Sequence, residues 1–71
     1  MGFTVTAAEL KKFLEAKGFY AVGQNGSHLK MTNGTRTTVV PIHSGDMKQK
    51  TARGILAQAG FKVNDVMNWR Q

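Results

Sequence analysis

Two Asn-Gly dipeptides, Asn25-Gly26 and Asn33-Gly34, constrain the fold of this 71-residue chain more than any other feature. Asn-Gly is typical of two-residue β-hairpin turns, because both central residues of a type I′ turn need a positive φ, which asparagine tolerates and glycine adopts freely. The segments that these turns separate are short and rich in β-branched and aromatic residues, as strands are. They run over about residues 19–24, 27–32 and 35–42. The sequence therefore predicts three antiparallel strands joined by hairpins.

The first turn decides which side chains share a face of the predicted sheet. With Asn25-Gly26 at its centre, Gly23 lies opposite His28, and Ala21 lies opposite Lys30. Because side chains alternate across a strand, His28 and Lys30 share one face, which the small residues beside them leave open to a ligand. The other face is expected to be the core face, and it carries Tyr20, Val22, Leu29 and Met31.

The third strand is less regular. A two-residue turn at Asn33-Gly34 would place Arg36 on the core face, so we expect a longer loop or a bulge near Arg36. Pro41 has no backbone donor and belongs at the end of the strand or on an edge.

A first helix precedes the strands. Thr6 and Glu9 form a capping-box pattern at its start, and Gly18 supplies the stop at its end. Helical spacing predicts one buried stripe. It consists of Val5, Ala7, Leu10, Phe13 and Leu14.

The second helix has two possible starts. Ser44 caps a helix that begins near Asp46, or Thr51 caps a shorter one, and in both cases the helix ends at Gly60. Its buried residues are expected to be Ile55, Leu56 and Ala59, and a short last helix over 64–69 packs Val66 and Trp69 back onto the body.

Positive charge gathers near the start of this second helix, at Lys48, Lys50 and Arg53. Beside free backbone amides these side chains would form a phosphate clamp, because a helix N-terminus favours anions. The alternative is a solvated basic loop. The whole chain carries a formal charge of +6, which favours a polyanionic partner such as a nucleic acid.

The composition excludes several classes of protein. Without cysteine there is no disulfide framework and no cysteine-based zinc site, and no apolar run is long enough for a membrane span. A cytoplasmic protein without a membrane association is expected. Ser27 and His28 are adjacent in an extended segment and point to opposite faces, so they do not form a nucleophile and base pair. No histidine and carboxylate spacing indicates a metal site.

The expected architecture is α+β: a single domain over residues 1–71 in the order α-β-β-β-α, with a three-stranded antiparallel sheet and both helices on one face. This order is similar to that of double-stranded RNA-binding domains, abbreviated dsRBD.

A closer resemblance covers nearly the whole chain. Four segments occur in the order and at the spacings found in the HicA family of bacterial toxins. They are Lys17-Gly18-Phe19, Gly26-Ser27-His28, the run 39–45 from Val39 to Gly45, and the run 54–61 from Gly54 to Phe61. The resemblance implies a dsRBD-like ribonuclease that cleaves mRNA, needs no metal or other cofactor, and is held inactive by a HicB-type antitoxin.

The same resemblance assigns roles to residues. It makes His28 the catalytic residue and Gly26 and Ser27 parts of its motif. The family's Pro-x-His segment corresponds to Pro41 and His43, although Ile42 stands where the family often has a basic residue. We expect His43 either to orient the loop before the second helix or to take part in catalysis.

The chemistry is consistent with this assignment. RNA supplies its own nucleophile, the 2′-hydroxyl, and histidine is the side chain whose ordinary pKa best suits proton transfer near neutral pH. We therefore expect His28 to act as general base or acid, Lys30 to contact phosphate, and the product to be a 2′,3′-cyclic phosphate. Lys48, Lys50 and Arg53 are further expected RNA contacts. The alternatives are an RNA-binding module without catalysis and a small domain that binds an acidic protein.

Overall fold

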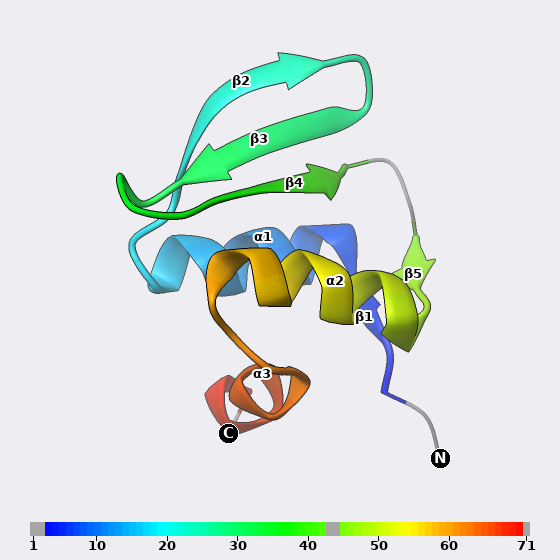
Figure 1. Cartoon of the computed structure of the whole chain (residues 1–71). Coiled ribbons are helices and arrows are strands. Elements are labelled where there is room, and N and C mark those ends of the chain that lie inside the picture. Colours follow the sequence, from blue (N-terminus) through cyan, green and yellow to red (C-terminus); the bar gives the residue numbers. More distant parts are fainter. Residues whose placement is uncertain (1–2, 43–44, 71) are drawn as a thin grey trace.

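A computed structural model describes residues 3–42 and 45–70 of the chain, and it has the predicted α+β architecture (Figure 1). Strands β2, β3 and β4 form an antiparallel sheet in that order, and a separate two-stranded sheet joins β1 to β5. The elements are β1 (Val5–Thr6), α1 (Ala7–Ala16), β2 (Tyr20–Asn25), β3 (His28–Thr32), β4 (Thr37–Pro41), β5 (Asp46–Met47), α2 (Gln49–Ala59) and α3 (Val63–Trp69).

Helices α1 and α2 lie side by side on one face of the three-stranded sheet, as predicted (Figure 1). The core fills the space between the two layers, and α3 packs against α1 and α2 on the side away from the sheet, below them in this view. Its largest fully buried side chains are Phe13, Leu10, Leu14, Met31, Leu56, Val5, Val40, Val66 and Thr38. The opposite face of the sheet, called the outer face from here on, carries none of the helices that the described residues form.

Helix α1 follows its sequence pattern closely. The Thr6 hydroxyl accepts a hydrogen bond from the Glu9 amide at 3.1 Å, as an N-cap should. At the other end Gly18 has a φ of +93°, and the Phe19 amide donates to the Leu14 carbonyl at 2.9 Å. The predicted buried stripe of this helix is confirmed.

The β2–β3 hairpin differs from the prediction by one residue. Asn25 pairs with His28, so the two central turn residues are Gly26 and Ser27 and not Asn25 and Gly26. Gly26 has a φ of +62°, whereas no described residue other than glycine has a positive φ. This combination fits a type II′ turn, which needs a positive φ only at its first central position and so spares Asn25 the left-handed conformation.

A bulge further along β2 changes the register again. Gly23 pairs with Lys30 and Ala21 pairs with Met31, which leaves Val22 as the extra residue. Tyr20 then pairs with Thr32. The prediction that Tyr20 and Val22 are buried is wrong, because they are 54% and 50% exposed, respectively. The predicted burial of Leu29 and Met31 is confirmed.

The β3–β4 connection is longer than a two-residue turn, as the position of Arg36 required. Thr32 pairs with Thr37, and the intervening loop closes with a 3.1 Å hydrogen bond from the Asn33 amide to the Arg36 carbonyl. Arg36 is therefore kept off the core face. Pro41 ends β4, where its missing donor is harmless.

Helix α2 begins at a position that neither sequence alternative gave. Its N-cap is Lys48, which makes no side-chain capping bond, while Thr51 lies within the first turn. Ser44 lies outside the described residues. Asp46 and Met47 form the short strand β5 against β1, so the backbone stays extended up to Lys48. The helix ends at Gly60 as predicted, with a φ of +90°.

The remaining helix predictions are confirmed. Helix α2 buries Ile55, Leu56 and Ala59, and α3 buries Val66. Trp69 packs edge-to-face on the ring of Phe13, with the ring centroids 5.6 Å apart. The last helix therefore adds aromatic contacts to the core.

Candidate nucleic-acid interface

His28 and Lys30 lie on the outer face of the sheet. Both side chains are exposed, whereas Leu29 and Met31, which alternate with them along β3, are buried against the helices. A shallow hollow of about 350 Å³ lies at this position. It is lined by Gly23, Gln24, Asn25, His28, Lys30 and Val39. The two residues that the sequence placed on one open face are thus brought together at one depression.

The neighbours of His28 differ from those expected. Asn25 on β2 lies directly opposite it, and Pro41 lies on its other side on β4. Because cross-strand partners share a face, the Asn25 amide and the His28 imidazole both project from the outer face. Sequence reasoning missed Asn25 as a site residue because the Asn-Gly signal assigned it to the turn.

The turn beneath this hollow is fixed at both ends. The Gln24 side-chain amide donates to the Gly26 carbonyl at 2.9 Å, and the Ile42 amide donates to the Ser27 carbonyl at 2.7 Å. The second bond ties the Gly26-Ser27 turn to the chain that leaves β4. As a result, His28 directly follows a turn that is fixed by hydrogen bonds to β2 and to the residue after β4.

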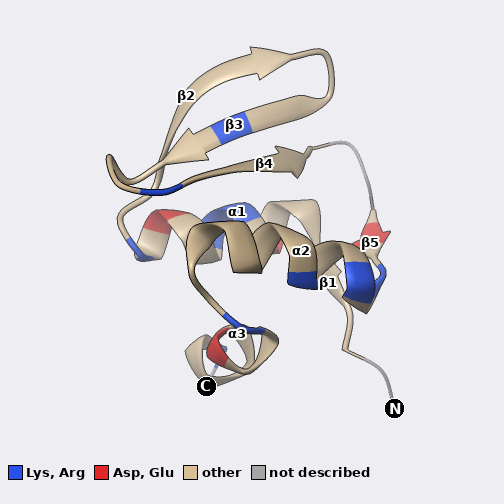
Figure 2. Cartoon of the chain, viewed as in Figure 1, with Lys and Arg blue, Asp and Glu red and all other residues tan. Residues whose placement is uncertain are grey.

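Lys48, Lys50 and Arg53 form a second group of cations at the N-terminal part of α2 (Figure 2). All three are exposed, and the first turn of the helix contains no acidic residue. A helix start whose first turn has no acidic residue and two lysines beside it favours anions, while Asp46 of β5 is an exposed acid close before it in the sequence. Lys48 and Lys50 thus flank the observed start of α2, and Arg53 follows within the helix. The phosphate clamp was expected for a helix capped by Thr51, so it stays a prediction.

The predicted RNA contacts nevertheless fall into two separate groups. Lys30 projects from the outer face of the sheet, while the cations of α2 belong to the helical layer behind it (Figure 2). Lys62 was not predicted as a contact, but it lines a hollow of about 410 Å³ together with Arg53. A basic residue directly after Gly60 and Phe61 carries no motif by which the sequence could have identified it.

Two further sequence predictions concern metals and membranes. Within residues 3–42 and 45–70, no three histidine, cysteine or acidic side chains gather in a way that could hold a metal ion. None of the helices in the described part of the chain has both the length and the apolar character of a membrane span. His43 lies outside the described residues, so its predicted role in the loop before α2 stays a prediction.

Comparison with known proteins agrees with the geometry. A family model described as the HicA toxin of bacterial toxin-antitoxin systems matches residues 7–61, which is most of the chain. This span includes the β2–β3 hairpin, the outer-face hollow and all of α2. A search of curated proteins found no match.

Proposed function

The chain belongs to the HicA family of bacterial toxins, and is thus the toxin of a toxin–antitoxin system; from this we propose that it is an endoribonuclease that cleaves mRNA through His28. The observation that carries the proposal is the exposed imidazole of His28 beside Lys30 in an open hollow of the outer face. A proton-transfer group and a cation that share one accessible surface are the minimum that RNA cleavage by its own 2′-hydroxyl needs.

The proposed reaction is a displacement at phosphorus. The 2′-oxygen forms a bond to phosphorus and the bond from phosphorus to the 5′-oxygen breaks, leaving a 2′,3′-cyclic phosphate and a 5′-hydroxyl. His28 takes the proton of the 2′-hydroxyl as base or gives one to the 5′-oxygen as acid, and water serves the other transfer. Lys30, two residues further along β3 on the same face, offsets the charge that develops on the phosphate oxygens.

Asn25 gives this site a third polar group. Its amide lies across from His28 and has both a donor and an acceptor, so it can hold a phosphate oxygen or orient the imidazole. Gly23, across from Lys30, has no side chain that would obstruct an RNA backbone. Together these residues leave room for a single strand along the outer face. As the family resemblance implies, the proposed reaction needs no metal.

The proposed partner is a HicB-type antitoxin. The net charge of +6 and the uncovered outer face favour a partner that presents acidic side chains to this surface. By covering His28 and Lys30, such a partner would exclude RNA from the hollow. Neutralisation would then need no change in the toxin itself.

A second candidate function is RNA binding without cleavage. It is favoured by the separate cation group on α2, Lys48, Lys50 and Arg53, which lies away from His28. In that case His28 would only contact the ligand, and phosphate contacts would supply most of the affinity.

The two functions are separated by incubating RNA with the chain in excess chelator and comparing it with His28→Ala. Loss of a proton-transfer residue is expected to lower the cleavage rate by about 10²- to 10⁴-fold. Lys12→Ala is the matched control, because Lys12 is an exposed cation on α1. Cleavage that continues unchanged in His28→Ala would contradict the proposal, as would products that end in a linear 3′-hydroxyl. Salt-sensitive binding without cleavage would favour the second candidate.

A further inference from the structure

The bulge at Val22 determines the direction of Tyr20. In the observed hairpin Gln24 pairs with Leu29, so without the bulge Val22 would pair with Met31. Tyr20, two residues further, would then project toward the helices as well. The extra residue reverses this alternation, so that Ala21 pairs with Met31 on the helix side and Tyr20 projects from the outer face.

The hollows on the two sides of the sheet agree with this assignment. Ala21 lines a depression together with Ala7, Ala8 and Lys11 of α1, so it faces the helical layer. Tyr20 is its neighbour in a strand and therefore faces the other way. The residue is 54% exposed. The aromatic ring that the sequence assigned to the core thus belongs to the same face as His28.

The neighbours of Tyr20 across the sheet are small. Its row of the sheet continues with Thr32 on β3 and Thr37 on β4, both of which have small side chains. The hydroxyls of these threonines are 3.2 Å apart, and that of Thr32 also donates to the Arg36 carbonyl at 2.8 Å. Their hydroxyl groups are therefore engaged with each other and with the β3–β4 loop.

Three functional groups follow one another along the outer face. The row of Tyr20 and Thr32 is followed by the row of Lys30, and then by the row of His28. Rows on one face of a strand are two residues apart, which places the first and third rows roughly 13 Å apart. A single strand of RNA that crosses these rows would bring a phosphate to His28, another to Lys30, and a base to Tyr20.

We propose that Tyr20 is a stacking platform for an unpaired nucleobase of the RNA substrate, close to but outside the bond that is cleaved. This inference rests on the proposed function for the position of the cleaved bond. Aromatic side chains on an open sheet face stack on unpaired bases, and the contact adds affinity because the ring loses little freedom on binding. Every base has a flat face, so stacking on Tyr20 increases affinity without creating a strong sequence preference.

The test measures binding to RNA that cannot be cleaved, so it does not depend on catalysis. The probe is a short single-stranded RNA of mixed sequence with 2′-deoxy nucleotides at each candidate cleavage position, prepared also as a series that lacks one base at a time. Fluorescence anisotropy then gives the Kd for the wild-type chain, Tyr20→Ala and Tyr20→Phe. Met67→Ala is the matched control, because Met67 is a similarly exposed apolar residue but lies on α3 and not on the sheet.

We expect Tyr20→Ala to bind the complete RNA about 10-fold or more weakly, and Tyr20→Phe and Met67→Ala to bind it like wild type. One abasic position should weaken wild-type binding by a similar factor while leaving Tyr20→Ala unaffected. The inference is overturned if Tyr20→Ala binds the RNA as tightly as wild type does. It is also overturned if every abasic position raises the Kd of wild type and of Tyr20→Ala by the same factor. Binding that depends on Tyr20 in a chain that never cleaves RNA would refute the proposed nuclease activity alone. Absence of any RNA binding would refute both.

Discussion

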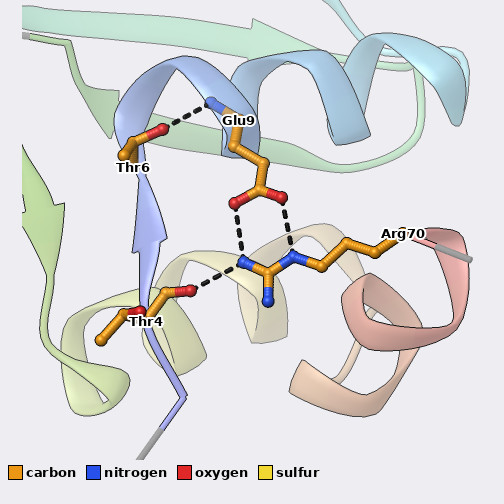
Figure 3. A network of polar contacts seen from close by, with 4 residues as sticks. All are labelled: Thr4, Thr6, Glu9 and Arg70. Atoms are coloured by element: carbon orange, nitrogen blue, oxygen red, sulfur yellow. Dashed lines mark hydrogen bonds and ion pairs between the residues drawn. The ribbon is translucent and has the colours of Figure 1, made fainter.

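Arg70 and Glu9 form a bidentate ion pair that joins the end of the described chain to the first helix (Figure 3). The guanidinium Nε and Nη2 atoms donate to the two carboxylate oxygens at 2.7 and 2.6 Å, and Nη2 also donates to the Thr4 carbonyl at 2.7 Å. The hydrogen bonds to Glu9 raise the pKa of Arg70 further above its ordinary value, against an opposing effect of burial. The guanidinium also lies 5.0 Å from the ring centroid of Phe3. One side chain therefore fastens the C-terminal end of α3 to α1 and to Thr4, directly before β1.

Replacing Arg70 should destabilise the fold without affecting the outer face. The paired side chains are about one third exposed, so solvent screens their attraction and Arg70→Ala should lower the free energy of unfolding by about 1 kcal/mol. For a domain of this size that corresponds to a Tm lower by roughly 4–8 °C. Arg70→Lys should recover only part of the lost stability, because the single ammonium nitrogen of lysine cannot replace two parallel hydrogen bonds from a guanidinium. Thermal unfolding of both variants and of Glu9→Gln checks this, and an Arg70→Ala chain as stable as wild type would show that the contact contributes nothing.

Replacing Gly54 should instead stabilise the fold. It lies within α2, is exposed, and a Cβ at this position would meet nothing within 4 Å. Gly54→Ala should therefore raise the free energy of unfolding by about 0.5–1 kcal/mol, because alanine loses less backbone freedom on entering a helix. Gly18→Ala is the contrasting variant: it also meets no atom, but its φ of +93° is unfavourable for alanine, so it should be destabilising. Urea unfolding measures the stability of both variants, and the prediction is contradicted if the two substitutions change the free energy of unfolding in the same direction.

The two groups of cations should differ in their effect on RNA binding. If Lys30 contacts one phosphate of a single strand, Lys30→Gln should reduce the slope of log K against log salt concentration by about 0.7. Replacing Lys48, Lys50 and Arg53 together should reduce it by about 2 if each one contacts a phosphate. Lys12→Gln removes an equal charge from an exposed position of α1 and should leave the slope unchanged. Titration at several salt concentrations gives the slopes, and a reduction by Lys12→Gln as large as that by Lys30→Gln would mean that only net charge matters.

The helices could be predicted from the sequence because their signals are local. Thr6 caps α1 through a side chain three residues from its partner, and Gly18 and Gly60 supply the positive φ that ends each helix. Burial of Leu29 and Met31 followed from the alternation along a single strand. The open position of His28 and Lys30 followed from the same alternation, which is why this part of the site was predicted despite the wrong turn.

The features that were missed depend on contacts between distant segments. The start of α2 is set by the pairing of Met47 with Val5, and two residues carry no periodicity from which such a strand can be recognised. The bulge at Val22 has no local signature either, since it adds one residue to one strand and is defined only by its partner. For that reason the sequence placed Tyr20 on the wrong face. Asn25 was missed separately, because the Asn-Gly pattern assigned it to the turn and not to the position beside His28.

The same bulge bears on how the free chain behaves at high concentration. Strand β2 is an edge of the sheet and is exposed along its whole length, so its backbone could template the addition of a strand from another molecule. An extra residue in the middle of the strand breaks the regular spacing of its outward-facing amides and carbonyls, and a straight strand cannot match them. The irregularity that exposes the tyrosine thus also protects the β2 edge against pairing with a strand of another molecule.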